Sequence, residues 1–79
     1  MAGYVREITS EIVQELCVLE EHGTWNLEFN VVKWNGNEPK YDIRPWNSDH
    51  SRCGKGITLS EESLKRLVEY CNQAQLMSI

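Results

Sequence analysis

Two segments with alternating side chains, joined by a tight turn, constrain the fold of this chain most strongly. Apolar and polar residues alternate in segment 25–34 (WNLEFNVVKW) and again in segment 40–46 (KYDIRPW). Successive side chains of a strand point to opposite faces, so each segment is typical of a strand with one apolar and one polar face. The residues between them, 35–39 (NGNEP), are a strong turn signal. The sequence therefore predicts an antiparallel hairpin at the centre of the fold.

One further strand on each side of this hairpin and a C-terminal helix complete the expected fold. Segment 11–20 (EIVQELCVLE) fits a strand or a helix by spacing alone, but its dense apolar and β-branched residues and the turn cluster after it favour a strand. A short strand is expected at about 56–59. Ser60 is a good N-cap for a helix over about 61–75, where apolar residues recur at helical spacing. The prediction is an α+β fold: a four-stranded antiparallel sheet followed by one C-terminal helix.

The chain has 79 residues, enough for one domain with a thin core. A chain of this size buries only about 60% of the surface that it exposes when unfolded, and oligomerisation is a usual remedy. We therefore expect a single domain over 1–79 that forms a homodimer. Apolar residues make up 41% and charged residues 25%, as in soluble globular proteins. No apolar run has the length of a transmembrane helix, nor do residues 1–7 have the apolar core of a signal peptide.

Cysteine, histidine and acidic residues show no catalytic pattern. Cys17, Cys53 and Cys71 form an odd, sparse set, which fits a reducing compartment better than a disulfide framework. Asp49, His50 and Cys53 share one loop, but their spacing matches neither a metal site nor an oriented Cys–His nucleophile. The sequence therefore predicts a cytoplasmic protein that is not an enzyme and holds no metal or cofactor.

The distribution of charge qualifies the net charge of −4, which by itself argues against a nucleic-acid partner. Residues 1–32 contain one basic and six acidic residues. Residues 33–55 contain three acidic residues and five basic ones: Lys33, Lys40, Arg44, Arg52 and Lys55. The same basic segment holds two of the three tryptophans, Trp34 and Trp46. A nucleic-acid site, if present, is expected in this segment.

Cationic and aromatic side chains share the polar face of the predicted hairpin. Alternate residues of a strand lie on the same face, here called residues of the same parity. The polar face of segment 40–46 carries Lys40, Arg44 and Trp46. The polar face of segment 25–34 carries Trp34 at its end. Lys55 lies between two glycines, which let a backbone approach a ligand closely. Such rings and cations on an open sheet suit single-stranded nucleic acid. Unstacked bases stack on tryptophan for about 1–3 kcal/mol each, while the cations neutralise phosphates.

Structural roles compete with this interpretation. A tryptophan on the surface of a small sheet is more often an interface or packing residue than a platform for bases. Lys40 and Arg44 also flank Asp42, as on an ordinary solvated strand. Three functions stay open on the residues alone: a single-stranded DNA-binding dimer, an RNA-binding protein or nucleic-acid chaperone, and a protein-interaction module.

Two separated motifs resemble a known family. Segment 41–46 (YDIRPW), a polar loop and segment 54–60 (GKGITLS), followed by a helix, are similar to the positive cofactor four family of transcriptional coactivators. The greater similarity is to its bacterial YdbC-type branch, over about residues 10–72. The resemblance implies a homodimeric chain of four strands and a helix. Its sheets would form grooves for single-stranded DNA with little sequence preference, in a nucleoid-associated role in transcription, replication or repair.

The resemblance also implies roles for individual residues. Four match DNA-facing positions of the family by their place in the motifs: Trp34, Arg44, Trp46 and Lys55. Three further cations are expected phosphate contacts by position and charge only: Lys33, Lys40 and Arg52. The family's C-terminal helix helps to form its dimer interface, and this chain has a suitable apolar stripe there: Leu64, Leu67, Val68 and Cys71.

Overall fold

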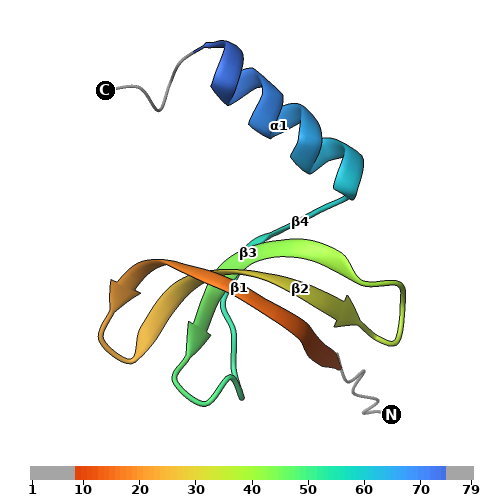
Figure 1. Ribbon diagram of the computed structural model, residues 1–79. Helices are drawn as coiled ribbons and strands as arrows, with labels where there is room; N and C mark the ends of the chain where they lie inside the picture. Colours follow the sequence, from red (N-terminus) through yellow and green to blue (C-terminus); the bar gives the residue numbers. More distant parts are fainter. Residues whose placement is uncertain (1–8, 75–79) are drawn as a thin grey trace.

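The computed structural model describes residues 9–74 and contains a four-stranded sheet followed by one helix (Figure 1). The elements in chain order are β1 (Ser10–His22), β2 (Trp25–Trp34), β3 (Lys40–Asn47), β4 (Ile57–Leu59) and α1 (Glu61–Gln73). The strands pair in the order β1-β2-β3-β4, and each neighbouring pair is antiparallel. The predicted fold class is confirmed, including the strand at 11–20. The helix ends at Gln73, and residue 75, its expected last residue, lies outside the described residues.

The turn between β2 and β3 has the conformation that its residues favour. Asn35 and Gly36 have φ values of 53° and 76°, and the Asn37 N–H donates to the Trp34 carbonyl at 2.9 Å. Positive φ at both central positions is typical of a type I′ turn, whose twist matches that of two antiparallel strands. The pairing of β2 with β3 begins beyond the turn, with Val32 facing Lys40 and Glu28 facing Arg44, one residue away from the register that a two-residue turn alone would give.

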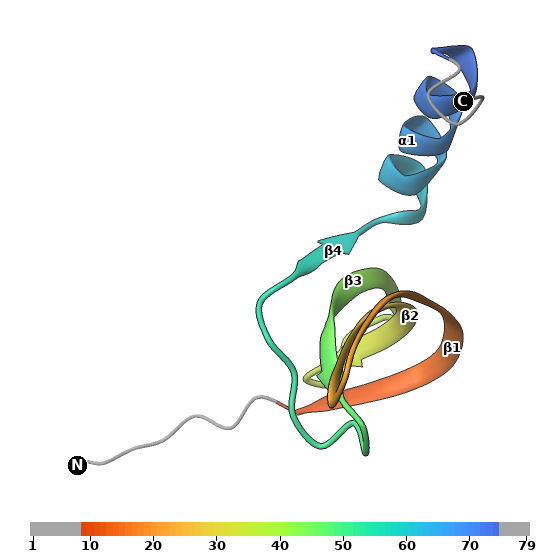
Figure 2. The same ribbon diagram turned by 90° about the vertical axis from the view of Figure 1, so that its left-hand side faces the viewer.

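The sheet curls strongly, so that it encloses one of its two faces (Figure 2). Three register shifts interrupt the pairing of β1 with β2 over residues 12–20, and such bulges bend a strand and increase its twist. The buried residues of the sheet all belong to one face of β2 and β3: Glu28, Asn30, Val32, Asp42 and Trp46. This is the face that alternation assigned to solvent. The expectation of an open polar face is therefore wrong, because curvature turns that face into the concave side of the sheet.

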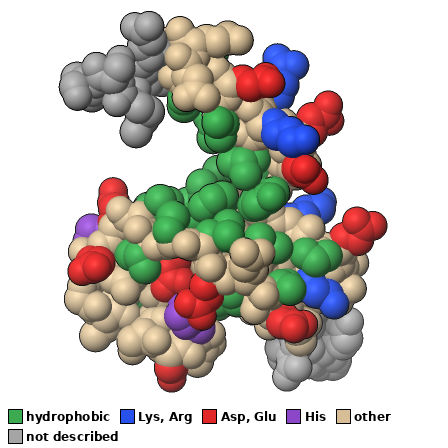
Figure 3. Space-filling view, viewed as in Figure 1, with side chains coloured by type: hydrophobic (Ala, Val, Ile, Leu, Met, Phe, Trp, Pro, Cys, Tyr) green, Lys and Arg blue, Asp and Glu red, His purple; other side chains and the backbone are tan. Residues whose placement is uncertain are grey.

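Apolar side chains gather on the convex face, beneath α1, as Figure 3 shows. The β2 and β3 residues of this face are half-buried: Leu27, Phe29, Val31, Tyr41 and Ile43. Helix α1 begins after Ser60, whose Oγ accepts the Ser63 N–H, and it contacts β3 and β4. None of its residues is buried, and Leu67 and Val68 are 48% and 50% exposed. The helix therefore leaves much of this apolar surface uncovered.

Candidate nucleic-acid interface

An aromatic pair with a guanidinium forms the centre of the site. The rings of Trp34, at the end of β2, and Trp46, on β3, lie 6.4 Å apart between centroids with an angle of 17° between their planes. The Arg44 Cζ lies 4.4 Å from the centroid of the Trp34 ring, within the range of a cation–π contact. The structure thus brings together three residues that the sequence predicted to share a site.

A buried carboxylate holds Arg44 in this position. The Arg44 Nε and Nη2 donate to the two carboxylate oxygens of Asp42 at 2.6 and 2.9 Å. The Thr58 hydroxyl on β4 donates to the same carboxylate at 3.0 Å. Asp42 is fully buried and the Arg44 side chain is 15% exposed, so each charge is compensated mainly by the other. Arg44 is therefore oriented firmly but adds little net positive charge to the surface.

The two indoles line a groove of about 460 Å³, here called the Trp34 groove. Its walls come from the four strands, the turn between β2 and β3 and the loop after β3: Ser10, Trp34, Asn35, Arg44, Trp46, Ser51, Cys53 and Thr58. Trp34 is half-buried, whereas Trp46 is only 2% exposed, so Trp46 supports Trp34 more than it presents a ring of its own. Within residues 9–74 neither buried indole N–H has a hydrogen-bond partner.

The glycines around Lys55 serve the packing of the chain against β3. A Cβ on Gly56 would overlap the Arg44 Cβ and the Ile43 carbonyl oxygen, and one on Gly54 would lie 2.8 Å from the Pro45 Cγ. The sequence predicts that these glycines let the backbone approach a ligand closely. The structure shows a close approach of the protein's own backbone instead, which leaves the Lys55 side chain exposed.

The remaining predicted cations lie in different places. Lys40 is exposed and has the parity of Arg44 on β3. Arg52 is exposed in the loop after β3, where its N–H donates to the Asn47 Oδ1 at 2.9 Å. Lys33 has the opposite parity to Trp34 on β2, so it belongs to the convex side of the strand and not to the Trp34 groove.

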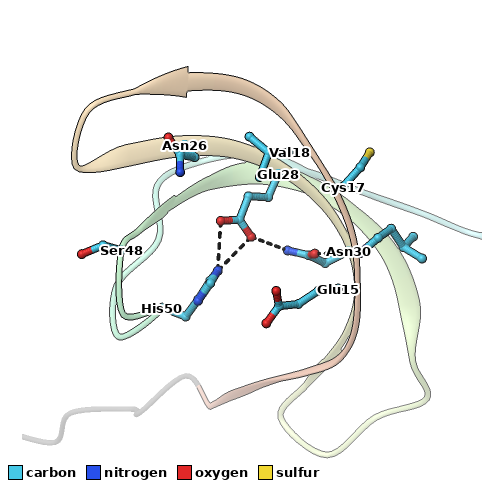
Figure 4. A pocket seen from close by; sticks show the side chains of 9 residues that line it. Glu15, Cys17, Val18, Asn26, Glu28, Asn30, Ser48 and His50 are labelled. Atoms are coloured by element: carbon cyan, nitrogen blue, oxygen red, sulfur yellow. Dashed lines mark hydrogen bonds and ion pairs between the residues drawn. The ribbon is translucent and has the colours of Figure 1, made fainter.

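A second polar cluster lies deeper on the concave face (Figure 4). The His50 Nε2 lies 2.9 Å from both carboxylate oxygens of Glu28, and the Asn30 Nδ2 donates to the same carboxylate at 3.0 Å. The His50 ring also contacts Trp46, with 5.8 Å between centroids. This cluster fixes the loop after β3 over the concave face, next to the aromatic pair.

The loop that carries His50 is braced by its own polar residues. The Ser51 hydroxyl and N–H donate to the Asp49 carboxylate at 2.6 and 3.1 Å, and the hydroxyl bond is the main cause of a lowered pKa of Asp49. Asn47 donates from its Nδ2 to the Ser51 Oγ at 3.0 Å. His50 itself has a φ of 59°, which places its side chain toward Glu28 from within this tight loop.

Sequence reasoning missed this cluster. It placed Glu28 and Asn30 on a solvated face and interpreted His50 as a loop residue with at most a weak contact to phosphate. Their parity was an available signal, since both residues share the face of Trp34 on β2. Among the described residues, no group of three or more His, Cys, Asp or Glu side chains could hold a metal ion. The one helix that the structure describes is too short and too polar to cross a membrane.

Comparison with known proteins identifies the family. A family model described as Transcriptional Coactivator p15 (PC4) matches residues 22–70, more than half of the chain. The chain belongs to the PC4 family. A protein of Treponema pallidum (strain Nichols), described as uncharacterized, is 42% identical to this PC4-family chain over 52 residues. The match covers 66% of this chain and 61% of the relative, so the chain spans less than two thirds of that relative's length.

The PC4 match contains all the residues expected to face DNA, since they lie between Lys33 and Lys55. It also confirms the resemblance drawn from the two motifs. Strand β1 lies before the matched range, apart from its last residue, His22. The β1 side chains on the concave face are therefore features of this chain outside the PC4 match.

Proposed function

We propose that this chain binds single-stranded DNA as a homodimer, with little sequence preference, in a coactivator-like role. Membership of the PC4 family supports a single-stranded DNA-binding role. The observation that carries the proposal is the Trp34 ring, held against Trp46 and Arg44 at the wall of an open groove. A ring held in this way can stack on a base of any sequence, because every base has a π-face.

A single strand fits this site better than a duplex. The faces of the bases in a duplex are already stacked on one another, so they are closed to Trp34. Charge alone would not select DNA, because Asp42 compensates Arg44 and the chain has a net charge of −4. Stacking therefore contributes more than phosphate neutralisation. We place the role in the cytoplasm, at the nucleoid, in transcription, replication or repair.

The uncovered apolar surface supports the homodimer. Its exposed members on β4 and α1 are Ile57, Leu67, Val68 and Tyr70. Ile57 pairs with Ile43 of the half-buried apolar face, and Val68 lines a hollow with Tyr41 of the same face. This face has the opposite parity to the residues that line the Trp34 groove. A second copy that covered this surface would bury it without blocking the groove. The predicted interface residues Leu64, Leu67, Val68 and Cys71 belong to the same helix.

Fluorescence anisotropy of a labelled oligo(dT), compared with the same oligomer annealed to its complement, tests the proposal. We expect tighter binding of the single strand and quenching of tryptophan fluorescence. Trp34→Ala should remove most of the binding, whereas Trp25→Ala, at an exposed tryptophan outside the groove, should not. Equal affinity for both forms would refute the proposal, and a clear preference for a matched RNA oligomer would assign the site to RNA.

Sedimentation velocity tests the homodimer independently. We expect a dimer for the unmodified chain and a monomer for Leu67→Glu, which places a charge on the exposed helix face. Glu62→Gln, at an exposed residue of the first turn of α1, is the matched control. A monomeric unmodified chain at micromolar concentration would refute this part of the proposal.

A further inference from the structure

A second hollow of about 440 Å³ lies on the concave face, here called the Glu28 hollow (Figure 4). Its polar lining comes from three elements: Glu15 on β1, Asn26, Glu28 and Asn30 on β2, and Ser48 and His50 in the loop after β3. Trp46 lines the Trp34 groove and His50 lines the Glu28 hollow, and their rings are in contact. The two spaces are therefore neighbours across this ring pair, so a strand in the groove has the hollow beside it.

The charge of the Glu28 hollow excludes a phosphate. None of the described residues that line it is Lys or Arg, and two of them are carboxylic acids. The Glu28 side chain is only 8% exposed, so solvent screens its charge weakly. A phosphate placed here would be repelled, whereas an uncharged group with N–H donors would be attracted. The part of a nucleotide with that character is the base.

The hydrogen-bonding groups of the hollow select among bases. A carboxylate has about four acceptor positions, and the contacts of Glu28 with His50 and Asn30 leave capacity for a further donor. Glu15 supplies a second, exposed carboxylate. The Asn26 Oδ1 accepts the His22 N–H at 3.2 Å, so its Nδ2 group is the part that can donate to a ligand. The hollow thus offers several acceptors, one amide donor and the Ser48 hydroxyl, which can donate or accept.

Guanine matches this arrangement better than the other bases. Its Watson–Crick edge carries two neighbouring donors, N1–H and the N2 amino group, beside the O6 acceptor. Thymine presents one N–H between two carbonyl oxygens, which a carboxylate repels. Adenine and cytosine carry one amino group each. Leu16 and Val18 line the same hollow, so the flat faces of a base would meet apolar side chains.

We infer that the Glu28 hollow receives one base of the bound strand and prefers guanine, read by the Glu28 and Glu15 carboxylates. The inference rests on the proposed function and adds to it a preference at a single nucleotide. The aromatic site remains tolerant of sequence, because stacking on Trp34 does not read base edges. Glu15 on β1 precedes the segment that matches the PC4 family, so part of the recognition of the base comes from a residue outside that match.

Anisotropy with single-base substitutions in a short oligo(dT) tests the inference. The shortest oligomer that still binds is used, so that it can occupy the site in only a few alternative positions. One central dT is replaced by dG, dA, dC or deoxyinosine. A single dG cannot form a four-stranded guanine structure within one strand. We expect dG to bind about tenfold tighter than dT, the order of magnitude of one bidentate base contact. Deoxyinosine, which lacks the N2 amino group, should lose most of this advantage.

Variants connect the preference to the carboxylates. Glu28→Gln should remove the dG advantage, measured as the ratio of dG to dT affinity within the same variant. Because Glu28→Gln can also loosen His50, Glu15→Gln, at an exposed position, is the second variant and should reduce the advantage in part. Glu21→Gln, also exposed on β1 but outside the hollow, is the control and should keep it.

The outcomes separate this inference from the proposed function. Equal affinity for dG and dT, with binding of oligo(dT) intact, overturns the inference and leaves the proposed function standing. An advantage of dG that deoxyinosine shares, or that survives in both Glu28→Gln and Glu15→Gln, also overturns it. No binding of any oligomer refutes the proposed function, and the inference falls with it.

Discussion

The buried ion pair under the Trp34 groove predicts a large and selective loss of stability for Asp42→Asn. The Asp42 carboxylate is fully buried and accepts two bonds from Arg44 and one from Thr58. The amide has nearly the same shape but no charge, and its NH₂ group would face the guanidinium or the Thr58 hydroxyl. The Arg44 side chain, 15% exposed, would then carry a charge that little else compensates.

The expected cost follows from this burial. Removal of one partner of a buried ion pair costs about 3–5 kcal/mol, because the other charge stays desolvated. Small domains have a total stability of about 0.05–0.15 kcal/mol per residue, so this loss would be a large part of the whole. A loss of 1 kcal/mol shifts the melting temperature of a domain of this size by about 4–8 °C. We therefore expect a fall of at least about 12 °C.

Thermal unfolding followed by circular dichroism measures this loss, at one fixed protein concentration because the proposed dimerisation would make stability depend on concentration. Glu38→Gln, at an exposed turn residue, is the control and should change stability by no more than about 0.5 kcal/mol. The double variant Asp42→Ala, Arg44→Met removes both charges and should recover much of the loss. A single Asp42→Asn variant that melts within about 4 °C of the unmodified chain would refute the assignment of a buried, mutually compensated pair.

Three further predictions follow from the site. Trp34→Ala should weaken oligo(dT) binding by about 5- to 150-fold, the loss of one stacked base, with the circular dichroism spectrum unchanged; a smaller loss by anisotropy would contradict the stacking role. Lys55→Ala should lower affinity for all sequences and reduce the salt dependence by about one phosphate contact, whereas Lys33→Ala, on the convex side, should leave both unchanged. Gly56→Ala should destabilise the fold, because its Cβ would overlap β3, and a variant that melts like the unmodified chain would show that the segment can shift.

The strands and the helix could be predicted because their signals are local. Alternation marks β2 and β3, the Asn35-Gly36 pair has the positive φ values that a type I′ turn requires, and Ser60 caps the helix where expected. The shared face of Trp34 and Arg44 was also predictable, since both residues have the polar parity of the hairpin. Their contact was not, because the register puts Arg44 opposite Glu28, six residues from Trp34 along β2. The predictable features depend on neighbours within a few residues or on one hairpin.

The burial of the polar face could not be predicted in this way. Parity states which side chains lie together but not whether their face is open or enclosed. Whether the face is enclosed depends on the bulges between β1 and β2, and no local sequence motif predicts these bulges. The same curvature buries Trp46 and brings His50, 22 residues away in sequence, to Glu28. The Gly54 and Gly56 contacts with β3 likewise appear only when the two segments are side by side.

The enclosed polar face also determines how an acidic chain can bind DNA. Because buried charges need partners, Arg44 pairs with Asp42, and its charge is largely lost to phosphates. The exposed cations on or beside the groove's elements are Lys40, Arg52 and Lys55. Each phosphate neutralised on a single strand contributes about −0.7 to the slope of log affinity against log salt concentration, so three give about −2 per protomer. A slope steeper by about 0.7 would mean that Arg44 leaves Asp42 on binding. A slope near zero would mean that stacking on Trp34 carries the affinity alone.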